Sequence, residues 1–431
     1  MAIREEGRRD LQAIMAGWME RHGTPEDLGE LEELAEEVSR VVGRSVVECG
    51  LESSGERRGY RGSSVACECG RKARFVSYRP RGVGTLFGTV SIERAYYHCK
   101  HCKTAQVPWD REQGLSRLIW TPRVKALVSQ VAARLPYGES VDLLAQLTGF
   151  EIEESGAERV VAEVGGRLRA EEGELMSGYD CGEITPLVAQ ASDRLYVGMD
   201  GTSAHIDGSW CEVKTGVVYD REVGSDGMDV CGDQRYVAAQ EYAERFGERL
   251  YVTAAQGGVE WAEEVVVIGD GAEWIWNLAA HHYPGAVEIL DYWHACEHIY
   301  ELARVYYGEG NAKGKRWAQD HCRWLKERGP GTLLRSLNRM KPKTVEQEKA
   351  IEREWGYFTR NRKRMQYARY RQKGMMIGSG PVEAGCKTVV GARLKGSGMR
   401  WSSDGADAVL AIRTALLSRH YDRVQRMAKV A

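Results

Sequence analysis

Two aspartates lie directly after largely apolar segments of the chain. Asp200 follows residues 195–199, and Asp270 follows residues 265–269. In an α/β sheet, residues just past the strand ends line the crevice where ligands bind, and the glycine after each aspartate would leave space for a metal ion or a phosphate. Two such carboxylates, if brought together, would hold Mg²⁺ (or Mn²⁺). A single Asp-Gly after a strand is more often a simple turn, but two in one sheet favour a metal site.

A second set of candidate ligands consists of cysteines at short spacings. The four are Cys67, Cys69, Cys99 and Cys102. Thiolates bind Zn²⁺ tetrahedrally, and two short knuckles can supply all four ligands of a structural site, as in a zinc ribbon. Cys-x-x-Cys is the usual knuckle, whereas Cys-x-Cys is tighter, so His98 or His101 could occupy one position instead. The alternative is four unrelated reduced cysteines.

A third group, Asp291, His294, Cys296 and His298, follows the next apolar run. One interpretation is a second zinc site formed by the two histidines and the cysteine. Their spacing does not place all three on one face of a helix. The pattern therefore favours aromatic packing around a hydrogen-bonded histidine.

The net charge of the chain is close to zero, but its basic residues are segregated. The overall value is -2, whereas residues 360–400 hold eleven Lys and Arg against one acid, and residues 71–103 hold eight against one. The two segments thus carry +10 and +7. Such patches are typical of proteins that bind a phosphate backbone. The alternative is that these bases pair with acidic segments of the chain itself.

The composition is that of a folded protein of several domains. The chain has 431 residues, of which 43% are hydrophobic and 28% charged. No apolar run approaches the ~18 residues of a membrane-spanning helix, and the first ten residues are mostly polar, so we expect no signal peptide and no membrane contact. Eleven cysteines in a long chain without an export signal indicate reduced thiols or metal ligands rather than disulfides.

Local patterns predict the elements of the first half of the chain. Helices are expected within residues 1–60, a loop at 50–64, strands at 74–78 and 89–97, and helices from 122, at 140–147 and at 155–168. Thr121-Pro122 is a typical helix start, and the last three helices form a helix-turn-helix-like unit. Several glutamates crowd the start of its last helix, where they would repel DNA, so ordinary helical packing is favoured over groove reading.

The second half alternates between strands and helices. Strands are expected at residues 195–206, 211–219, 250–254, 265–268 and 286–290, with a helix at 269–281. This alternation predicts a mixed sheet flanked by helices. Residues 295–370 show no strand pattern and are expected to form a helical insertion.

Glu383 is the only acid in the basic segment of residues 360–400. Pro381 predicts a helix start, so Glu383 should lie in the first turn of a helix that runs to about Leu394. One interpretation is an exposed ion pair with Lys387 at i, i+4. The other, which we favour, is that Glu383 is the third carboxylate of the metal site formed by Asp200 and Asp270, with Glu273 or Asp404 as the next candidates.

Four motifs taken in order carry a resemblance to a known family. They are Gly-Met-Asp200-Gly-Thr, Gly-Asp270-Gly-Ala-Glu-Trp-Ile, Asp291-Tyr-Trp-His294 and Gly378-Ser379-Gly380-Pro381-Val382-Glu383. This order resembles the DDE transposases of bacterial insertion sequences, and in particular the Kra-type family. The resemblance spans about residues 67–420, although the Cys-x-Cys spacing departs from the zinc ribbon expected there.

The resemblance implies an RNase H-like catalytic domain in which Asp200, Asp270 and Glu383 hold Mg²⁺, with Asp291 and His294 near the catalytic centre. It implies cleavage of double-stranded DNA at terminal inverted repeats and joining to target DNA by two-metal chemistry. We expect a homo-oligomer on DNA, in the bacterial cytoplasm and associated with the nucleoid. The residues expected to bind DNA are Arg362, Lys363, Arg364, Lys387, Arg393 and Lys395.

The expected fold is α/β, with an RNase H-like mixed sheet interrupted by a helical insertion. The expected parts are a helical region at 1–64, a zinc-ribbon-like module at 65–112, a helix-turn-helix-like unit at 113–190, the catalytic domain at 191–294 and 371–425, and the insertion at 295–370. Two other functions remain open. One is a catalytically silent, transposon-derived DNA-binding protein, and the other is an RNase H-like nuclease or resolvase without strand transfer.

Overall fold

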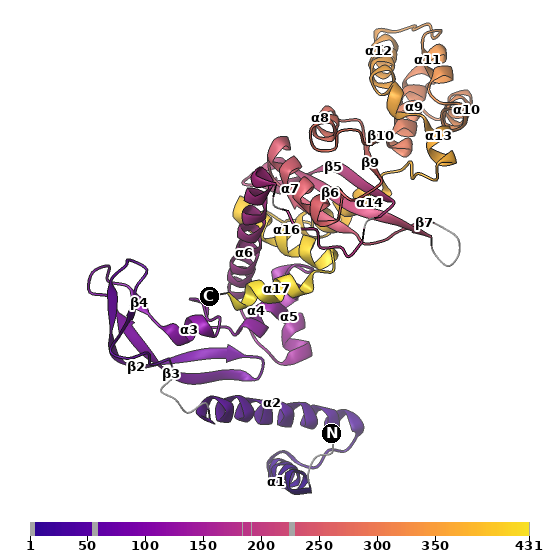
Figure 1. Cartoon of the computed structure of the whole chain (residues 1–431). Coiled ribbons are helices and arrows are strands. Elements are labelled where there is room, and N and C mark those ends of the chain that lie inside the picture. Colours follow the sequence, from indigo (N-terminus) through magenta and orange to yellow (C-terminus); the bar gives the residue numbers. More distant parts are fainter. Residues whose placement is uncertain (1–4, 54–58, 183, 191, 224–228, 431) are drawn as a thin grey trace. The chain divides into compact units, whose positions relative to one another are not determined.

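The computed structural model describes residues 5–53, 59–182, 184–190, 192–223 and 229–430 (Figure 1). The chain divides into two compact units, residues 1–164 with 424–431, and residues 165–423. Each unit has hydrophobic clusters of its own. Within the described residues, no helix has the length and apolar character needed to cross a membrane.

The first unit begins with two helices and an antiparallel sheet. The helices are α1 (Glu5–His22) and α2 (Leu28–Ser53). The strands are β1 (Ser64–Ala66), β2 (Lys72–Thr85), β3 (Gly88–His98) and β4 (Ala105–Gln106), in the order β1-β2-β3-β4. The two predicted strands are confirmed within β2 and β3. The loop expected at 50–64 is wrong for residues 50–53, which continue α2, and residues 54–58 lie outside the described part of the chain.

Four helices follow in the first unit, and three of them match the predicted helical unit. They are α3 (Pro108–Glu112), α4 (Pro122–Ala132), α5 (Tyr137–Thr148) and α6 (Glu154–Cys181), which continues into the second unit. Thr121 caps α4 by accepting a hydrogen bond from the backbone N–H of Val124, as predicted. Lys125 of α4 is fully buried and lies 2.9 Å from Glu163, so an ion pair fixes α4 against α6.

A mixed sheet forms the core of the second unit. Its strands are β5 (Arg194–Ile206), β6 (Ser209–Val223), β7 (Asp229–Cys231), β8 (Arg235–Ala239), β9 (Glu264–Gly269) and β10 (Val287–Leu290). The order is β10-β9-β5-β6, and both β7 and β8 pair with β6. Strands β10, β9 and β5 are mutually parallel, whereas β6 is antiparallel to β5 and to β8. Four of the five predicted strands and the mixed sheet are therefore confirmed.

The strand predicted at residues 250–254 is wrong, because these residues lie in α7 (Ala243–Gln256). The apolar run was ambiguous, since a short buried run fits a strand or a buried helical face equally well. Phe246, Leu250 and Ala254 recur every four residues and are fully buried, which is the helical period. The predicted helix after Gly269 is confirmed as α8 (Glu273–His282).

Helices cover both faces of this sheet. A Cβ atom at Gly216 would lie 2.7 Å from Leu250 of α7, and one at Gly198 would lie 3.1 Å from Val382 of α14 (Gly380–Gly385). Gly216 pairs with Met199, and Gly198 pairs with Val217, so the two glycines face opposite sides. The two helices therefore pack closely on opposite faces of the sheet.

Residues 292–372 are helical, as predicted for 295–370. They form α9 (Tyr292–Tyr307), α10 (Ala312–Arg328), α11 (Gly331–Leu337), α12 (Val345–Arg360), the 3₁₀ turn η1 (Arg362–Arg364) and α13 (Tyr367–Gln372). Their buried members, such as Leu325 and Phe358, belong to the same hydrophobic cluster as the sheet. We call residues 292–372 the helical lobe. Because it shares a core with the sheet, it is an integral part of the second unit.

After the helical lobe, residues 380–394 form a helix that packs on the sheet and has a π-helical segment in its middle. After α14 come the π-helical segment η2 (Cys386–Gly391) and α15 (Ala392–Leu394). The predicted helix end at Leu394 is confirmed, but the π-helical segment was not expected. Helices α16 (Ser403–Leu417) and α17 (Tyr421–Lys429) complete the chain.

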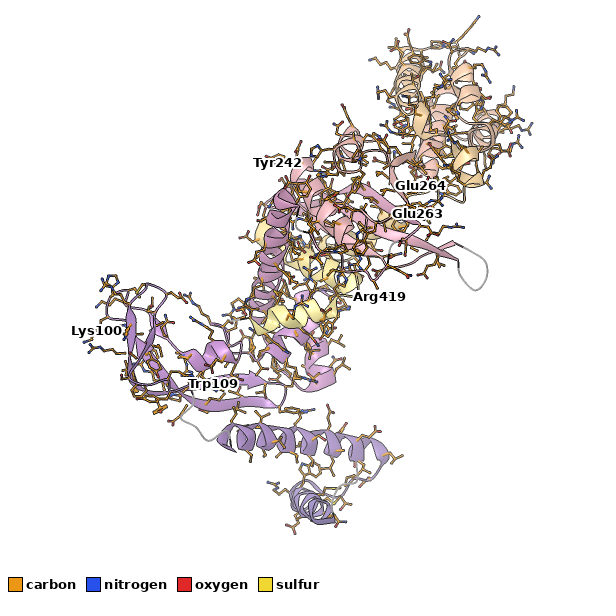
Figure 2. All side chains as sticks on the ribbon, viewed as in Figure 1. Lys100, Trp109, Tyr242, Glu263, Glu264 and Arg419 are labelled. Carbon is orange, nitrogen blue, oxygen red and sulfur yellow. The ribbon has the colours of Figure 1, made fainter. Side chains whose placement is uncertain are left out.

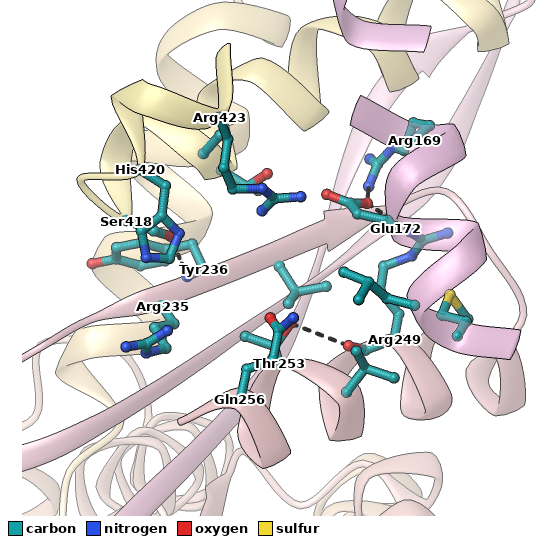
Figure 3. A pocket seen from close by; sticks show the side chains of 16 residues that line it. Arg169, Glu172, Arg235, Tyr236, Arg249, Thr253, Gln256, Ser418, His420 and Arg423 are labelled. Atoms are coloured by element: carbon teal, nitrogen blue, oxygen red, sulfur yellow. Dashed lines mark hydrogen bonds and ion pairs between the residues drawn. The ribbon is translucent and has the colours of Figure 1, made fainter. Parts of the chain in front are cut away.

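A small cavity in the second unit contains charged groups that are already paired (Figure 3). Its volume is about 40 Å³. Glu172 of α6 lies 2.7 Å from both Arg169 and Arg249, and Arg249 also lies 2.5 Å from Glu241. Although burial opposes ionisation, the two arginines hold the pKa of Glu172 below its ordinary value. This network joins α6 to α7 and is structural.

Candidate functional site

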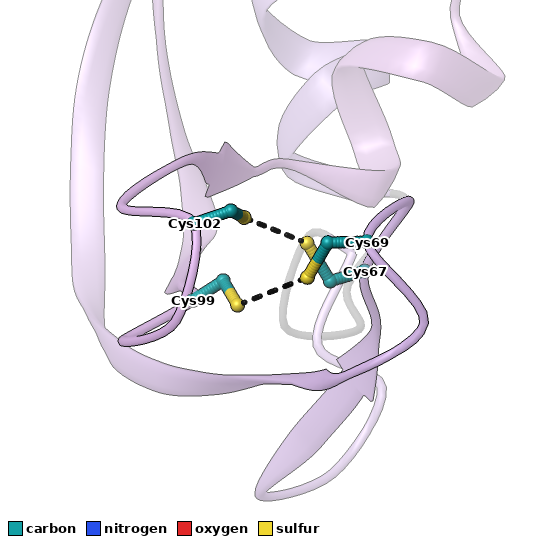
Figure 4. Close-up of side chains that lie close together, drawn as sticks. All are labelled: Cys67, Cys69, Cys99 and Cys102. Carbon is teal, nitrogen blue, oxygen red and sulfur yellow. Dashed lines mark hydrogen bonds between the residues drawn. The ribbon is translucent and has the colours of Figure 1, made fainter.

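The four predicted cysteines meet in the first unit (Figure 4). All four sulfur atoms lie within 4.8 Å of one another. The Sγ atoms of Cys67 and Cys102 are 3.5 Å apart, and those of Cys69 and Cys99 are 3.7 Å apart. Tetrahedral binding with Zn–S bonds of about 2.3 Å requires sulfur separations of about 3.8 Å. These two separations are close to that value, so the cluster could hold a metal ion such as zinc.

The backbone shapes each cysteine pair into a knuckle. The N–H of Gly70 donates to the carbonyl of Cys67, and the N–H of Lys103 donates to the carbonyl of Cys99. Gly70 and Lys103 both have positive φ, 78° and 61°, which closes the turn. The tighter Cys-x-Cys pair thus still provides two ligands, and neither His98 nor His101 belongs to the cluster.

The thiols differ in their tendency to ionise. The Thr104 hydroxyl, 2.9 Å from the Cys102 sulfur, lowers the pKa of Cys102 to about 6. Although a hydrogen bond from the backbone of Arg71 lowers it, burial and the neighbouring sulfurs raise the pKa of Cys69 to about 12. Four thiolates cannot share this space without a cation, because each negative charge opposes the next. A divalent metal ion would resolve that conflict.

The module around the cysteines has a small core and a basic surface. The buried members of its hydrophobic cluster include Cys67 and Cys99 themselves. Arg71, Lys72, Arg74, Arg79, Lys100 and Lys103 are exposed, and Figure 2 shows Lys100 on the knuckle loop. Arg81 and Arg94 instead pair with the buried Asp110 at 2.7 and 3.0 Å. Six of the eight basic side chains in this segment are thus exposed at the surface, and the other two stabilise the module.

Asp200 and Asp270 lie at the same level of adjacent parallel strands. Gly198 of β5 pairs with Ile268 of β9, so the residues two positions further on each strand are neighbours on the same face. Asp291 continues this row, because Gly269 of β9 pairs with Leu290 of β10. Asp200 also pairs with Thr215 of β6. The three aspartates therefore form a row across three neighbouring strands. Asp270 and Asp291 directly follow β9 and β10, as predicted for Asp270, whereas Asp200 lies inside β5 and not past its end.

The carboxylate of Asp200 lies in a partly buried, polar environment. Burial raises its pKa above the ordinary value, and the negative charge of Asp270 raises it further. A hydrogen bond from the Cys386 thiol, a bond from the backbone N–H of Gly201 and the charge of His294 act in the opposite direction. Asp200, Asp270 and His294 are thus close enough to influence each other. Cys386, on the helix that carries Glu383, is a contact that sequence spacing gave no reason to expect.

The glycines after the two aspartates do not leave the open space that we predicted. A Cβ atom at Gly271 would lie 2.8 Å from the Tyr357 ring, and one at Gly201 would lie 2.5 Å from a carboxylate oxygen of Glu212. The space is filled by the chain's own side chains. Tyr357 reaches from α12 of the helical lobe and donates a hydrogen bond of 2.7 Å to the carbonyl of Asp270.

Tyr357 is itself held by a chain of contacts. Its ring stacks on His298 of α9 with 4.0 Å between ring centroids. Nδ1 of His298 lies 2.7 Å from the carboxylate of the fully buried Glu354. Although burial opposes ionisation, hydrogen bonds from His298 and Arg353 lower the pKa of Glu354. The lobe therefore fixes the loop after β9. Sequence patterns could not predict this role, because Tyr357 is far from Asp270 along the chain. Gly271 was the one local sign that another group approaches the backbone closely here.

Asp291 has a structural task in addition to its place in the row. It is 3% exposed and caps α9 by accepting a hydrogen bond of 2.8 Å from the backbone N–H of His294. Its other carboxylate oxygen accepts a 2.5 Å bond from the backbone N–H of Ser379 and a second bond from the Ser379 hydroxyl. We call this contact the Asp291–Ser379 clamp. It attaches the segment just before α14 to the end of β10.

Glu383 does not converge with the two aspartates in this structure. Among the described residues, the four cysteines form a group of candidate metal ligands whose atoms lie within 4.8 Å of one another. Asp200, Asp270 and Glu383 do not form such a group. The side chain of Glu383 is 60% exposed and lies 2.6 Å from Lys387. Its neighbours Val382 and Cys386 are buried. Glu383 is therefore on the helix that covers the aspartate face, and its carboxylate pairs outward.

The residues predicted to bind DNA divide into exposed and internal ones. Arg362, Lys363 and Lys395 are exposed, and Lys395 donates to the hydroxyl of Thr202. Arg364 lies 2.5 Å from Glu288 and packs over the Trp276 ring.

The prediction for Arg393 is wrong. Its side chain is 1% exposed and stacks on Trp401, with 4.6 Å between the guanidinium carbon and the ring centroid. Burial of the long side chain against an aromatic ring removes it from the surface.

The alternative second zinc site does not form. His294 lies 3.2 Å from Glu297, His298 pairs with Glu354, and neither belongs to a metal-ligating group with Cys296 among the described residues. The rings of His294 and His298 lie 5.0 Å apart in an edge-to-face arrangement. Aromatic packing around a hydrogen-bonded histidine, the favoured interpretation, describes these residues.

Comparison of the chain with protein-family models and with curated proteins finds no match. The chemistry of the cysteine cluster and of the aspartate row is therefore inferred from their own geometry.

Proposed function

We propose that this chain is a DDE-type transposase that cuts DNA at terminal inverted repeats of an insertion sequence and joins the 3′ ends to target DNA. The observation that carries the proposal is the register of Asp200 and Asp270 on adjacent parallel strands, on the face covered by the helix of Glu383. Phosphoryl transfer of this type needs carboxylates that hold divalent cations and a basic surface that holds the DNA in line.

The topology of the sheet supports an RNase H-like fold. The central strand β5 has β6 and then β8 on one side, each antiparallel to the last, and β9 and then β10 on the other, both parallel. The helices α7 and α8 lie between β8 and β9 and between β9 and β10. The helical lobe is inserted after β10, before the segment that carries Glu383.

The aspartate pair fits Mg²⁺. A carboxylate whose pKa is raised by burial and by a second carboxylate is ionised more readily beside a bound cation. When bound, Mg²⁺ would activate the attacking hydroxyl and stabilise charge on the phosphate. Asp200 and Asp270 would hold it directly. Glu383 would complete the ligand set after its exposed side chain leaves Lys387.

The cysteine cluster fits a structural zinc ion, because all four ligands are protein atoms and no position is left for a substrate. Its exposed bases would then present a fixed surface to DNA phosphates. The exposed Arg362 and Lys363 in the second unit, and the exposed Lys395, which donates to Thr202 of β5, would contribute further phosphate contacts.

The test is cleavage and strand joining by the purified full chain, with the DNA that flanks its own coding sequence as donor. We expect activity with Mg²⁺ and none with EDTA. Asp200→Asn, Asp270→Asn and Glu383→Gln should each abolish cleavage while folding and DNA binding persist. Glu273→Gln and Asp404→Asn are matched controls, since both acids lie in the first turn of a helix.

The outcomes separate the candidate functions. Loss of activity in a control variant, with Glu383→Gln active, would move the third ligand to that control residue. Cleavage without joining would identify an RNase H-like nuclease or resolvase. DNA binding without cleavage under any divalent cation would identify a catalytically silent DNA-binding protein.

A further inference from the structure

An open groove in the second unit lies beside the Asp291–Ser379 clamp. Its cationic side chains are Arg221 of β6, Lys326 of α10 and Arg371 of α13. No carboxylate is among the described residues that line it. The groove is therefore complementary in charge to an anionic ligand.

The wall of this groove contains an exposed indole. Trp293 is 65% exposed, although its neighbour Tyr292 is only 6% exposed. A Cβ atom at Gly378 would lie 3.2 Å from the Trp293 ring, so the backbone there packs against the indole. Met376 and Pro381 add apolar surface to the same groove. An exposed aromatic ring beside apolar side chains fits a planar, uncharged group.

Both ligand properties belong to one chemical class. A flat apolar group joined to negative charges at close spacing describes a nucleotide, whose base stacks on aromatic rings and whose phosphates pair with Arg and Lys. In a duplex the base faces are covered by their neighbours, so stacking on Trp293 requires an unpaired base. An acidic peptide would satisfy the cations but would not use the indole.

We infer that this groove binds an unpaired nucleotide of a DNA strand, with its base on Trp293 and its phosphates near Lys326 and Arg371. This inference rests on the proposed function for the identity of the ligand. Gly378 and Pro381 flank the clamped Ser379, and Glu383 follows two residues after Pro381. A strand held here would pass beside the aspartate row and the start of the Glu383 helix.

The test is equilibrium binding of the full chain to a fluorescent single-stranded oligothymidylate and to a blunt duplex, both in EDTA. Trp293→Ala should weaken single-strand binding by about 5- to 160-fold, because stacking of one base is worth about 1–3 kcal/mol. Trp293→Phe, which keeps a ring, should retain most of the affinity. Trp355→Ala is the matched control, since Trp355 is 45% exposed on α12 of the same lobe but lies outside the groove.

Arg371→Gln should lower the salt dependence of single-strand binding by about 0.7 in the slope of log K against log salt. Equal effects of Trp293→Ala and Trp355→Ala, equal losses for single strand and duplex, or competition by polyglutamate as effective as by oligothymidylate would each overturn the inference. Because no metal is present, this result is independent of Asp200, Asp270 and Glu383. Failure of cleavage with intact single-strand binding would overturn the proposed function alone.

Discussion

Asp291 accepts hydrogen bonds from both the backbone N–H and the hydroxyl of Ser379, 88 residues later in the chain. The same carboxylate caps α9, the first helix of the lobe. One buried side chain thus joins the end of β10, the start of the lobe and the segment that precedes Glu383. The position of the Glu383 helix therefore depends on Asp291.

Asp291→Asn should destabilise the protein by about 1–3 kcal/mol, because a buried, charge-assisted acceptor of several hydrogen bonds is replaced by a neutral amide. Ser379→Ala removes only the hydroxyl and should cost about 1 kcal/mol. The measurement is urea unfolding of each variant. Thr344→Ala, which removes an exposed cap of α12, is the reference at about 1 kcal/mol. An Asp291→Asn cost well below that of the reference would contradict the clamp.

The purified chain should contain one tightly bound zinc ion. Cys99→Ser with Cys102→Ser should release it and unfold the surrounding module, because few buried apolar residues support that module without the metal. Metal analysis and circular dichroism would measure the two effects. Cys211→Ser, at a half-buried position outside the cluster, should change neither. Less than one zinc per chain, or normal folding of the double variant, would refute a structural site.

Tyr357→Phe should reduce Mg²⁺-dependent cleavage more than it reduces stability. The variant keeps the ring that stacks on His298 but loses the hydrogen bond to the carbonyl of Asp270, worth about 1 kcal/mol. The loop that positions the Asp270 carboxylate then loses its fixed partner. Tyr300→Phe is the control, since Tyr300 is 38% exposed on α9 of the same lobe. Equal activity of the two variants would exclude a positioning role.

Acidification should destabilise the second unit through His282. Burial, and then the neighbouring His281, lower the pKa of His282 to about 4, against about 6.5 in an unfolded chain. The unfolded state therefore binds the proton first as the pH falls. The stability contributed by neutral His282 is complete above pH ~6.5 and is lost towards pH ~4, by at most on the order of 3 kcal/mol.

Urea unfolding at several pH values would measure this loss. His282→Gln should flatten the dependence between pH 6.5 and 4, whereas His281→Gln, at an exposed position, should largely preserve it. An unchanged profile in His282→Gln would assign the acid sensitivity to other groups.

The salt dependence of DNA binding should distinguish bases of the segment 360–400 that contact DNA from bases that pair within the protein. Replacing Arg362 and Lys363 by Gln should flatten the slope of log K against log salt for duplex DNA by up to about 1.8, at roughly 0.9 for each lost phosphate contact. Arg364→Gln should leave that slope unchanged and lower stability instead, because Arg364 pairs with Glu288. The reverse pattern would place Arg364 at the DNA surface.

Local sequence determined most of the elements and the ligands of the cysteine cluster. The short spacing of Cys99 and Cys102 limits how far apart their sulfurs can be, and the alternating pattern around them specifies a hairpin that returns the chain to Cys67 and Cys69. Similarly, the apolar runs at 195–199 and 265–268 specified β5 and β9, and Asp270 had to lie at the end of β9, whereas β5 continues past Asp200 to Ile206. Such features depend on neighbours within a few residues, so periodicity and spacing suffice.

Tertiary structure alone decided which side chains surround the aspartates. The parallel register of β5 with β9 sets Asp200 beside Asp270, and no local pattern specifies that pairing. Tyr357, Cys386 and Ser379 reach the site from segments far along the chain, and Arg393 is withdrawn from the surface by its stacking on Trp401. Leu250 was predicted to lie in a strand because a short run of buried apolar residues looks the same in the sequence whether it forms a strand or one face of a helix. Burial and long-range contacts are collective properties of the packed chain, and they distinguish residues that sequence patterns treat alike.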